Sequence, residues 1–252
     1  MPTLVAGLWL VAAFLPLLLL ERYIHRHLQG VWLLLFRSPD VATVLYALVM
    51  LPGVLLHEAS HWVMATLLGA RTGRFSVIPE RLPDGTLRLG FVETEATDFF
   101  REALIGAAPL IAGALAVSLI GNGLLGAGPV GEALARGDLE ALARNVLAFG
   151  AAPDAWVWIY LLFTVSNSML PSASDRRAWL PLLVFGLVLA GVLAYVGLGT
   201  LVLDFVVGPV DAAIRVLAAA FTIAVALDLA VAPILWLLER GLMRVTGLRV
   251  EY

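Results

Sequence analysis

The sequence predicts an all-α polytopic membrane protein, and three observations lead to this class. Of the 252 residues, 61% are hydrophobic and only 14% are charged, whereas about a quarter of an ordinary soluble domain is charged. Mean hydropathy is +0.95. The hydrophobic residues also fall into long runs, and a bilayer-spanning helix needs about 20 such residues. These features exclude a soluble globular domain and a disordered chain. In lipid, an α-helix satisfies the backbone hydrogen bonds of such a run internally.

Six hydrophobic runs are candidates for transmembrane helices. They comprise residues 3–20, 41–69, 103–125, 155–171, 179–198 and 212–238. The first run has no basic start and no small-residue cleavage site, so we expect a retained helix and not a cleaved signal peptide. We expect the polar residues after it, including His25 and His27, to form a loop. The whole chain, residues 1–252, is predicted to be a single transmembrane domain.

The charge distribution predicts the orientation and excludes some partners. Six spans place both termini on one side of the membrane, and ten of the sixteen arginines are then on that side. The positive-inside rule therefore predicts cytoplasmic termini in a multi-pass protein of a prokaryotic plasma membrane. A net charge of −3 without a basic tract argues against nucleic acid as a partner, and the absence of cysteine excludes thiolate sites. The expected environment is the lipid bilayer, and the oligomeric state stays open.

The second span contains a short motif that predicts a metal site. It reads His57-Glu58-Ala59-Ser60-His61. Histidines four residues apart leave the same side of a helix and can offer two nitrogens to one zinc ion. Glu58 lies beside them and can accept a proton from zinc-bound water. Ionisable side chains inside a membrane are costly unless they have a function or a partner. We therefore favour a zinc site, with Glu58 as its catalytic base, over a structural polar cluster.

A zinc site with two histidines lacks one protein ligand, and without cysteine we expect a carboxylate. The acids within or beside the spans are Asp175, Asp204, Asp228, Glu93, Glu95 and Glu102. The fourth span runs in the same direction as the second, and Pro171 ends or breaks its helix. The polar segment after Pro171 lies at a depth similar to that of the histidines. Asp175 belongs to this segment and is the predicted third ligand.

Three motifs together resemble the site-2 protease family of intramembrane zinc metalloproteases. They are residues 57–61, the Gly-Ala-Ala-Pro segment at 106–109, and the segment from Asn167 to Asp175, which is similar to the family's Asn…Pro…Asp-Gly segment. Here Pro171 is displaced by one position, and Arg176 replaces the family's glycine.

The resemblance implies a function and a cofactor. It places a catalytic core at about residues 41–178, with Zn²⁺ as the cofactor and His57, His61 and Asp175 as its ligands. It implies a zinc-dependent intramembrane endopeptidase that hydrolyses peptide bonds of transmembrane substrate proteins. The partner is then a transmembrane protein substrate.

Between the second and third spans, the sequence predicts a small β-hairpin. Residues 75–78 and 86–92 are the expected strands, and residues 82–85 carry typical turn chemistry. A free sheet edge could hold an extended substrate by strand addition, and the alternative is an ordinary polar hairpin on the cytoplasmic surface. The residues expected to bind substrate under the resemblance are Asn167, Phe75, Val77, Leu87, Leu89 and Phe91.

Two alternatives remain open. The first is a membrane metalloprotease with a glutamate from residues 93–102 as the third ligand. That ligand needs a helical segment returning to the site, whereas the residues around Glu93 and Glu95 are typical of a strand. The second is a non-catalytic zinc-binding transporter or scaffold. The intact Glu58 argues against lost catalysis, and a transporter should carry several intramembrane acids, of which only Asp228 qualifies.

Overall fold

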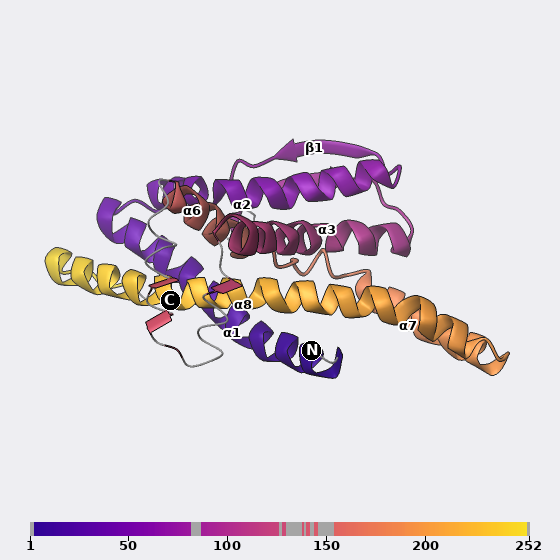
Figure 1. Ribbon diagram of the computed structural model, residues 1–252. Coiled ribbons are helices and arrows are strands. Elements are labelled where there is room, and N and C mark those ends of the chain that lie inside the picture. The colour runs from indigo at the N-terminus through magenta and orange to yellow at the C-terminus, as the bar shows by residue number, and fades with distance from the viewer. Residues whose placement is uncertain are drawn as a thin grey trace.

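The protein is a bundle of helices with a small antiparallel sheet beside α2 (Figure 1). The computed structural model describes residues 3–81, 87–125, 128–129, 138, 140–141, 144–145 and 154–250. In these residues the main helices are α1 (Thr3–Phe36), α2 (Pro39–Leu67), α3 (Phe99–Ser118), the π-helix η1 (Leu119–Leu124) that continues α3, α6 (Ala155–Ser166), α7 (Trp179–Tyr195) and α8 (Gly199–Thr246).

Local sequence signals explain where several helices begin and end. Ser38 caps α2 by accepting a hydrogen bond from the backbone N–H of Val41, and Pro39 occupies the first turn, where its missing N–H costs nothing. The Asp98 carboxylate caps α3 by accepting two backbone N–H bonds at 3.1 Å each. Helix α8 ends at Gly247, which has the left-handed φ of 70° that glycine adopts readily.

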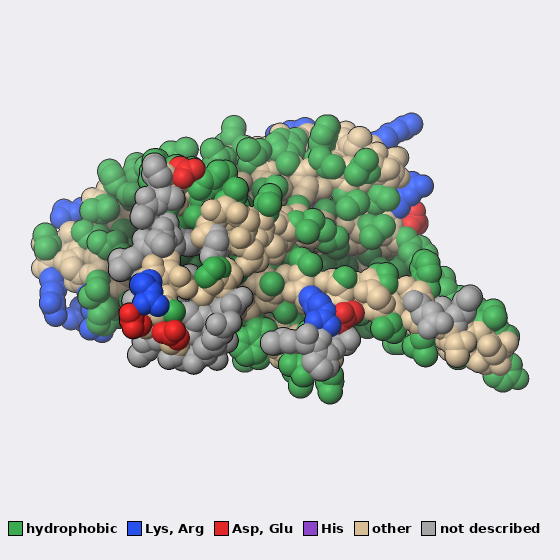
Figure 2. All heavy atoms as spheres, in the orientation of Figure 1, with side chains coloured by type: hydrophobic (Ala, Val, Ile, Leu, Met, Phe, Trp, Pro, Cys, Tyr) green, Lys and Arg blue, Asp and Glu red, His purple; other side chains and the backbone are tan. Residues whose placement is uncertain are grey.

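Among the described residues, four helices are long and apolar enough to cross a membrane. They are Leu4–Phe36, Pro39–Leu67, Phe99–Leu124 and Phe205–Thr246. Helices α6 and α7 have only 12 and 17 residues. The predicted helical class is therefore confirmed and compatible with an integral membrane protein, but only four of the six predicted spans are confirmed. On the face shown in Figure 2, hydrophobic side chains are spread along the length of the bundle and few charged ones are visible.

Helix α8 runs parallel to α1. The indole N–H of Trp9 donates to the Thr222 hydroxyl at 2.8 Å, and further along both helices His27 hydrogen-bonds Glu239. The amino-terminal end of α1 and the carboxyl-terminal end of α8 therefore lie at opposite ends of the bundle (Figure 1). This arrangement differs from the six-span prediction, which placed both termini on one side.

The difference arises because α6 and α7 do not reverse direction. Helix α6 runs parallel to α2, as predicted: Tyr160 donates to the carbonyl of Val49 at 2.9 Å, and eight residues later the carbonyl of Ser168 lies 2.6 Å from Nδ1 of His57. Helix α7 then continues in the same direction. It reaches the first turn of α3, where Phe185 of α7 packs against Phe99 and Phe100 of α3. The two helices thus run one after the other, and α8 alone returns.

Helix α1 continues well past the predicted end of the first span at residue 20. The prediction of a loop containing His25 and His27 is therefore wrong. His25 hydrogen-bonds the Tyr46 hydroxyl on α2 at 2.5 Å, and His27 bonds Glu239 on α8. Polar residues that resemble a loop in the sequence can remain helical here because neighbouring helices supply their partners.

Two apolar clusters hold the site-bearing helices in place. The larger joins α1, α3, α6 and α8, and it includes Leu17, Val117, Leu162, Phe221 and Ala224. The smaller joins α1, α2 and α8, and it includes Ile24, Tyr46, Met50 and Leu235. Close packing and polar contacts, more than exclusion of water, hold such helices together in lipid. These clusters fix α2 and α6 relative to one another.

The predicted hairpin between the second and third spans is present as two short antiparallel pairs. Strand β1 (Thr72–Ser76) pairs with β4 (Phe91–Thr94), and β2 (Glu80–Arg81) pairs with β3 (Leu87–Arg88). The predicted strand at 86–92 is therefore interrupted at residues 89–90. At Gly90 the backbone passes so close to α2 that an added Cβ would lie 2.8 Å from Cγ of Glu58. The predicted turn at 82–85 lies outside the described residues.

Candidate metal centre

His57 and His61 are oriented by backbone carbonyls of two other segments. Nδ1 of His57 lies 2.6 Å from the carbonyl oxygen of Ser168, and Nδ1 of His61 lies 2.8 Å from that of Ile105. A carbonyl can only accept a hydrogen bond, so each Nδ1 carries the hydrogen. In a neutral ring the other nitrogen, Nε2, then presents a lone pair.

The two Nε2 atoms face one another at 3.2 Å. In the neutral tautomers just assigned, no hydrogen lies between them, so two lone pairs meet at a separation that is unfavourable unless a proton or a cation lies nearby. An orienting N–H bond to a backbone carbonyl is also the usual arrangement of a metal-ligating histidine. The two histidine rings are therefore oriented so that both Nε2 atoms can bind one cation.

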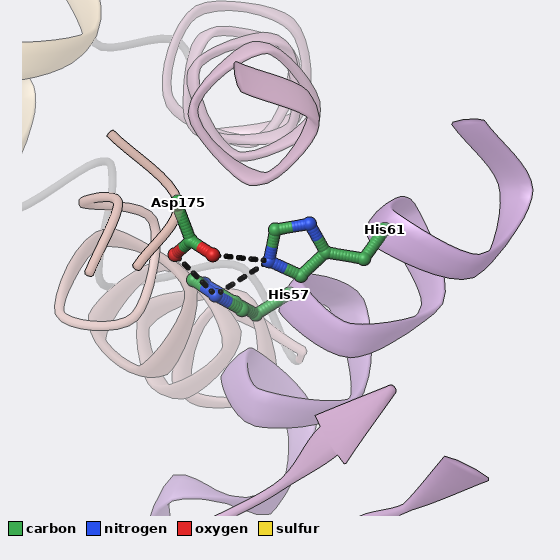
Figure 3. Close-up of side chains that lie close together, drawn as sticks. All are labelled: His57, His61 and Asp175. Atoms are coloured by element: carbon green, nitrogen blue, oxygen red, sulfur yellow. Dashed lines mark hydrogen bonds and ion pairs between the residues drawn. The ribbon is translucent and has the colours of Figure 1, made fainter. Parts of the chain in front are cut away.

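Asp175 adds a third candidate ligand to the two histidines (Figure 3). Its Oδ1 lies 3.4 Å from Nε2 of His61, and its Oδ2 lies 3.7 Å from Nε2 of His57. Ligands held at 2.0–2.1 Å in tetrahedral geometry are about 3.3 Å apart. His57, His61 and Asp175 therefore form a group that could hold a metal ion.

The loop between α6 and α7 presents Asp175 to the histidines. Its Oδ2 accepts the backbone N–H of Ser172 at 2.7 Å, and its own N–H donates to the Ser172 hydroxyl at 3.3 Å. Helix α3 comes so close that a Cβ at Gly106 would lie 1.9 Å from the carbonyl oxygen of Asp175. Only glycine at position 106 leaves space for this approach.

The charge of Asp175 is stabilised in place. Burial raises the pKa of this carboxyl, but the nearby His57 and His61 rings and the hydrogen bonds from Ser172 outweigh burial and lower its pKa from 3.8 to about 2. Asp175 is therefore a carboxylate throughout the range in which histidine titrates.

The other candidate acids whose side chains are described do not belong to the metal group, although Glu102 lines the same cavity. Glu93 accepts the backbone N–H of Arg74, Glu95 forms an ion pair with Arg71, and Glu102 forms one with Arg177 at 3.5 Å. Asp228 accepts a hydrogen bond from Asn167. The side chain of Asp204 lies outside the described residues.

Glu58 lies where a base would be needed. Its residue is 8% exposed, and no hydrogen bond or ion pair joins its carboxylate to another residue in the described part of the chain. It lines two cavities together with His57. One, of about 440 Å³, also contains His61 and Asp175; the other, of about 550 Å³, extends between the helices to Asn167. His57 and Glu58 therefore lie on the wall that the two cavities share.

Three of the six predicted substrate-binding residues line these cavities. Phe91 lines the cavity of the metal group, and Leu89 and Asn167 line the 550 Å³ cavity. Val77 packs against the smaller apolar cluster, whereas Phe75 is 42% exposed and lines neither cavity. The side chain of Leu87 is outside the described part of the structure.

Sequence reasoning missed the groups that hold the histidines. His25 lies 142 residues from Asn167, yet its Nε2 is 3.0 Å from that residue's carbonyl oxygen. The carbonyls of Ser168 and Ile105 were also missed, because a backbone acceptor leaves no signal in residue identity. Only the four-residue spacing of Glu21 and His25 indicates that this polar segment is helical; in the structure these side chains are 3.7 Å apart.

Comparisons with models of protein families, with curated proteins and with solved structures found no match to this chain.

Proposed function

We propose that the protein is a zinc-dependent intramembrane endopeptidase similar to the site-2 protease family. The single observation that carries the proposal is the convergence of two Nε2 lone pairs and one carboxylate at 3.2 to 3.7 Å. Two imidazoles and a carboxylate are a donor set typical of catalytic zinc, which keeps a fourth position open. A bound zinc ion would supply Lewis-acid chemistry by polarising the scissile carbonyl and acidifying water.

The residues of the chain have distinct roles in this proposal. His57, His61 and Asp175 hold the ion, and Ser168 and Ile105 fix the two rings through their carbonyls. Glu58 accepts the proton of the attacking water and transfers it to the nitrogen of the leaving amine. The absence of another partner for Glu58 among the described residues supports this role, because the carboxylate needs no bond broken before it acts.

The position of His57 and His61 on α2, a helix long and apolar enough to cross a membrane, supports a transmembrane substrate. A helix engages its carbonyls in internal hydrogen bonds, so a transmembrane segment must unwind before it can be cut. Strand β4 supports capture of the unwound segment, since Phe91, Val92 and Thr94 line the metal-group cavity. In the described residues β4 pairs only with β1, and its other edge can bind an extended peptide by strand addition.

A zinc-binding transporter is the second candidate, and one observation favours it. Besides Asp228, Glu21 on α1 lines the 550 Å³ cavity, and Glu239 on α8 is 3% exposed. Buried acids along a route are typical of ion pathways. Zinc uptake into vesicles that contain the purified protein would support this candidate.

The test of the proposed protease measures metal and cleavage in the same preparations. The full chain is reconstituted in lipid vesicles, its zinc content is measured, and cleavage of a transmembrane peptide is followed. We expect Glu58→Gln to retain zinc and to lose cleavage by about 100-fold or more, the contribution of a positioned general base. Glu95→Gln, which changes an exposed carboxylate, is the matched control and should behave like the parent. Parent protein that contains zinc but cleaves no faster than Glu58→Gln would overturn the protease.

A further inference from the structure

A chain of buried hydrogen bonds reaches His57 from the far side of the bundle. Asn167 and Ser168 directly follow α6, and the Ser168 carbonyl orients His57. The preceding residue, Asn167, is 2% exposed and is held by two other helices, through Asp228 on α8 and His25 on α1. The segment that orients a proposed metal ligand is therefore fixed from outside the metal site.

The contact with Asp228 is costly and specific. The residue is fully buried, its Oδ1 accepts the Asn167 side-chain amide at 2.8 Å, and in the described part of the chain its Oδ2 has no partner. A carboxyl group in the interior of an apolar helix is destabilising compared with a hydrophobic side chain. Packing alone therefore does not account for Asp228, and its position against Asn167 is the feature that needs an explanation.

The contact with His25 holds the backbone of the same residue. Nε2 of His25 lies 3.0 Å from the Asn167 carbonyl oxygen, and its Nδ1 is 2.5 Å from the Tyr46 hydroxyl. Because the carbonyl can only accept, Nε2 carries the hydrogen and Tyr46 donates to Nδ1. His25 thus joins α1, α2 and the end of α6 through two directed bonds.

We infer that Asp228 and His25 are positioning residues that orient His57 through Asn167 and Ser168; this inference rests on the proposed function. Peptide units are rigid planes, so fixing both the side chain and the carbonyl of Asn167 restricts the direction of the next carbonyl. That carbonyl sets the ring orientation of His57 and so directs its Nε2 toward Asp175. Groups of this kind typically contribute 10–100-fold to metal affinity.

The test is a Co²⁺ titration of the purified full chain in lipid nanodiscs, followed by the visible absorption of the bound ion. We expect Asp228→Ala to weaken Co²⁺ binding about 10-fold and to change the absorption spectrum, because His57 is no longer held in one orientation. Asp228→Asn keeps an oxygen acceptor for Asn167, and its new amide can donate to the Asn167 Oδ1, which has no partner among the described residues. It should therefore bind like the parent, which shows that the acceptor and not the charge is required.

Asp211→Ala is the matched control, since Asp211 lies on the same helix in an exposed pair with Arg215; it should leave affinity and spectrum unchanged. If Asp228→Ala fails to fold, His25→Leu removes the bond to the Asn167 carbonyl and should give the same loss and spectral change. A parent that binds Co²⁺, with Asp228→Ala or His25→Leu matching it in affinity and spectrum, overturns the positioning role alone. A parent that binds neither Co²⁺ nor Zn²⁺ overturns the proposed metalloenzyme together with this inference.

Discussion

At the scale of single residues, the candidate site depends on backbone carbonyls that bind Nδ1 of each histidine, so that only Nε2 is available to bind a metal ion. The carbonyls of Ser168 and Ile105 hold the Nδ1 hydrogens of His57 and His61, so both Nε2 lone pairs converge beside Asp175. The residue types required for this are few. Their arrangement, however, depends on backbone atoms more than 40 residues away in the sequence.

Asp175→Ala should abolish tight metal binding, with a loss of at least 10–100-fold, because it removes a proposed direct ligand and not only a supporting group. The measurement is the zinc dissociation constant by competition with a chelator of known affinity. Glu102→Ala is the control, since Glu102 lines the same cavity and pairs with Arg177. Loss of zinc in Glu102→Ala with retention in Asp175→Ala would instead assign the third ligand to a glutamate.

At the scale of elements, what the sequence can predict depends on whether the signal is local. The histidine pair is local, since a four-residue spacing in any helix places both rings on one side, and the apolar runs predict helices because lipid permits little else. The interruption after Ser166 and the shared direction of α6 and α7 depend on packing against α2 and α3. A hydropathy pattern contains no information about such contacts, so two short helices were predicted as full spans.

The same distinction applies to the hairpin. Its existence follows from short β-prone runs and a turn sequence, but its interruption at residues 89–90 arises where Gly90 meets Glu58. Likewise, the segment around His25 was predicted to be a loop because its polar residues, taken alone, have no reason to enter a bundle. Tertiary partners on α2 and α8 reverse that expectation.

Proline substitutions in β4 test whether its free edge holds substrate. The N–H groups of Val92 and Thr94 point to the same side of the strand, and that of Glu93 points to the other. Proline is placed at positions 92, 93 and 94 in turn. Where the replaced N–H faces the cavity, proline should slow peptide cleavage and leave zinc content unchanged, because it removes only a hydrogen-bond donor at the strand edge. Glu80→Pro, in the second strand pair, is the control. Unchanged cleavage in every folded, zinc-containing variant would show that the helices alone hold the substrate.

At the scale of the whole molecule, the parallel arrangement of α1 and α8 changes the expected topology. The end of α8, which carries Arg240 and Arg244, is at the opposite end of the bundle from the end of α2, after which Arg71 and Arg74 follow in the chain (Figure 1). The six-span scheme counted these arginines on the same side, whereas helices that cross the bilayer as they are arranged in the bundle would place them on opposite sides.

Tags at the two termini provide the test of topology. If the long axis of the bundle crosses the bilayer, the two termini lie on opposite sides of the membrane. An amino-terminal tag and a carboxyl-terminal tag should then be accessible to protease from opposite sides. The measurement compares tag cleavage in intact and opened vesicles. Cleavage of both tags from the same side would restore the six-span arrangement.

Acid should release the metal from the protein as a whole. Binding requires both imidazoles to be neutral, and ordinary imidazoles protonate near pH 6.5. Asp175, with its pKa lowered to about 2, remains charged and does not contribute to this release. Well below pH 6.5, affinity should fall by up to about 100-fold per pH unit, since two protons compete with the ion. Zinc retained after dialysis across stepped pH values checks this, and full retention near pH 3 would contradict a two-histidine site.

Helix α8 has one further consequence, which concerns the surrounding lipid. Its 48 residues extend about 72 Å at 1.5 Å per residue, more than twice the roughly 30 Å thickness of a bilayer's hydrocarbon core. Its first part pairs with α7, all of whose residues are described and none of which is buried. Lipid can cover this apolar hairpin only if the hairpin leans strongly or the leaflet thickens around it. The lipid around the protein is therefore arranged asymmetrically. The length of the lipid acyl chains should change the angle between the hairpin and the rest of the bundle.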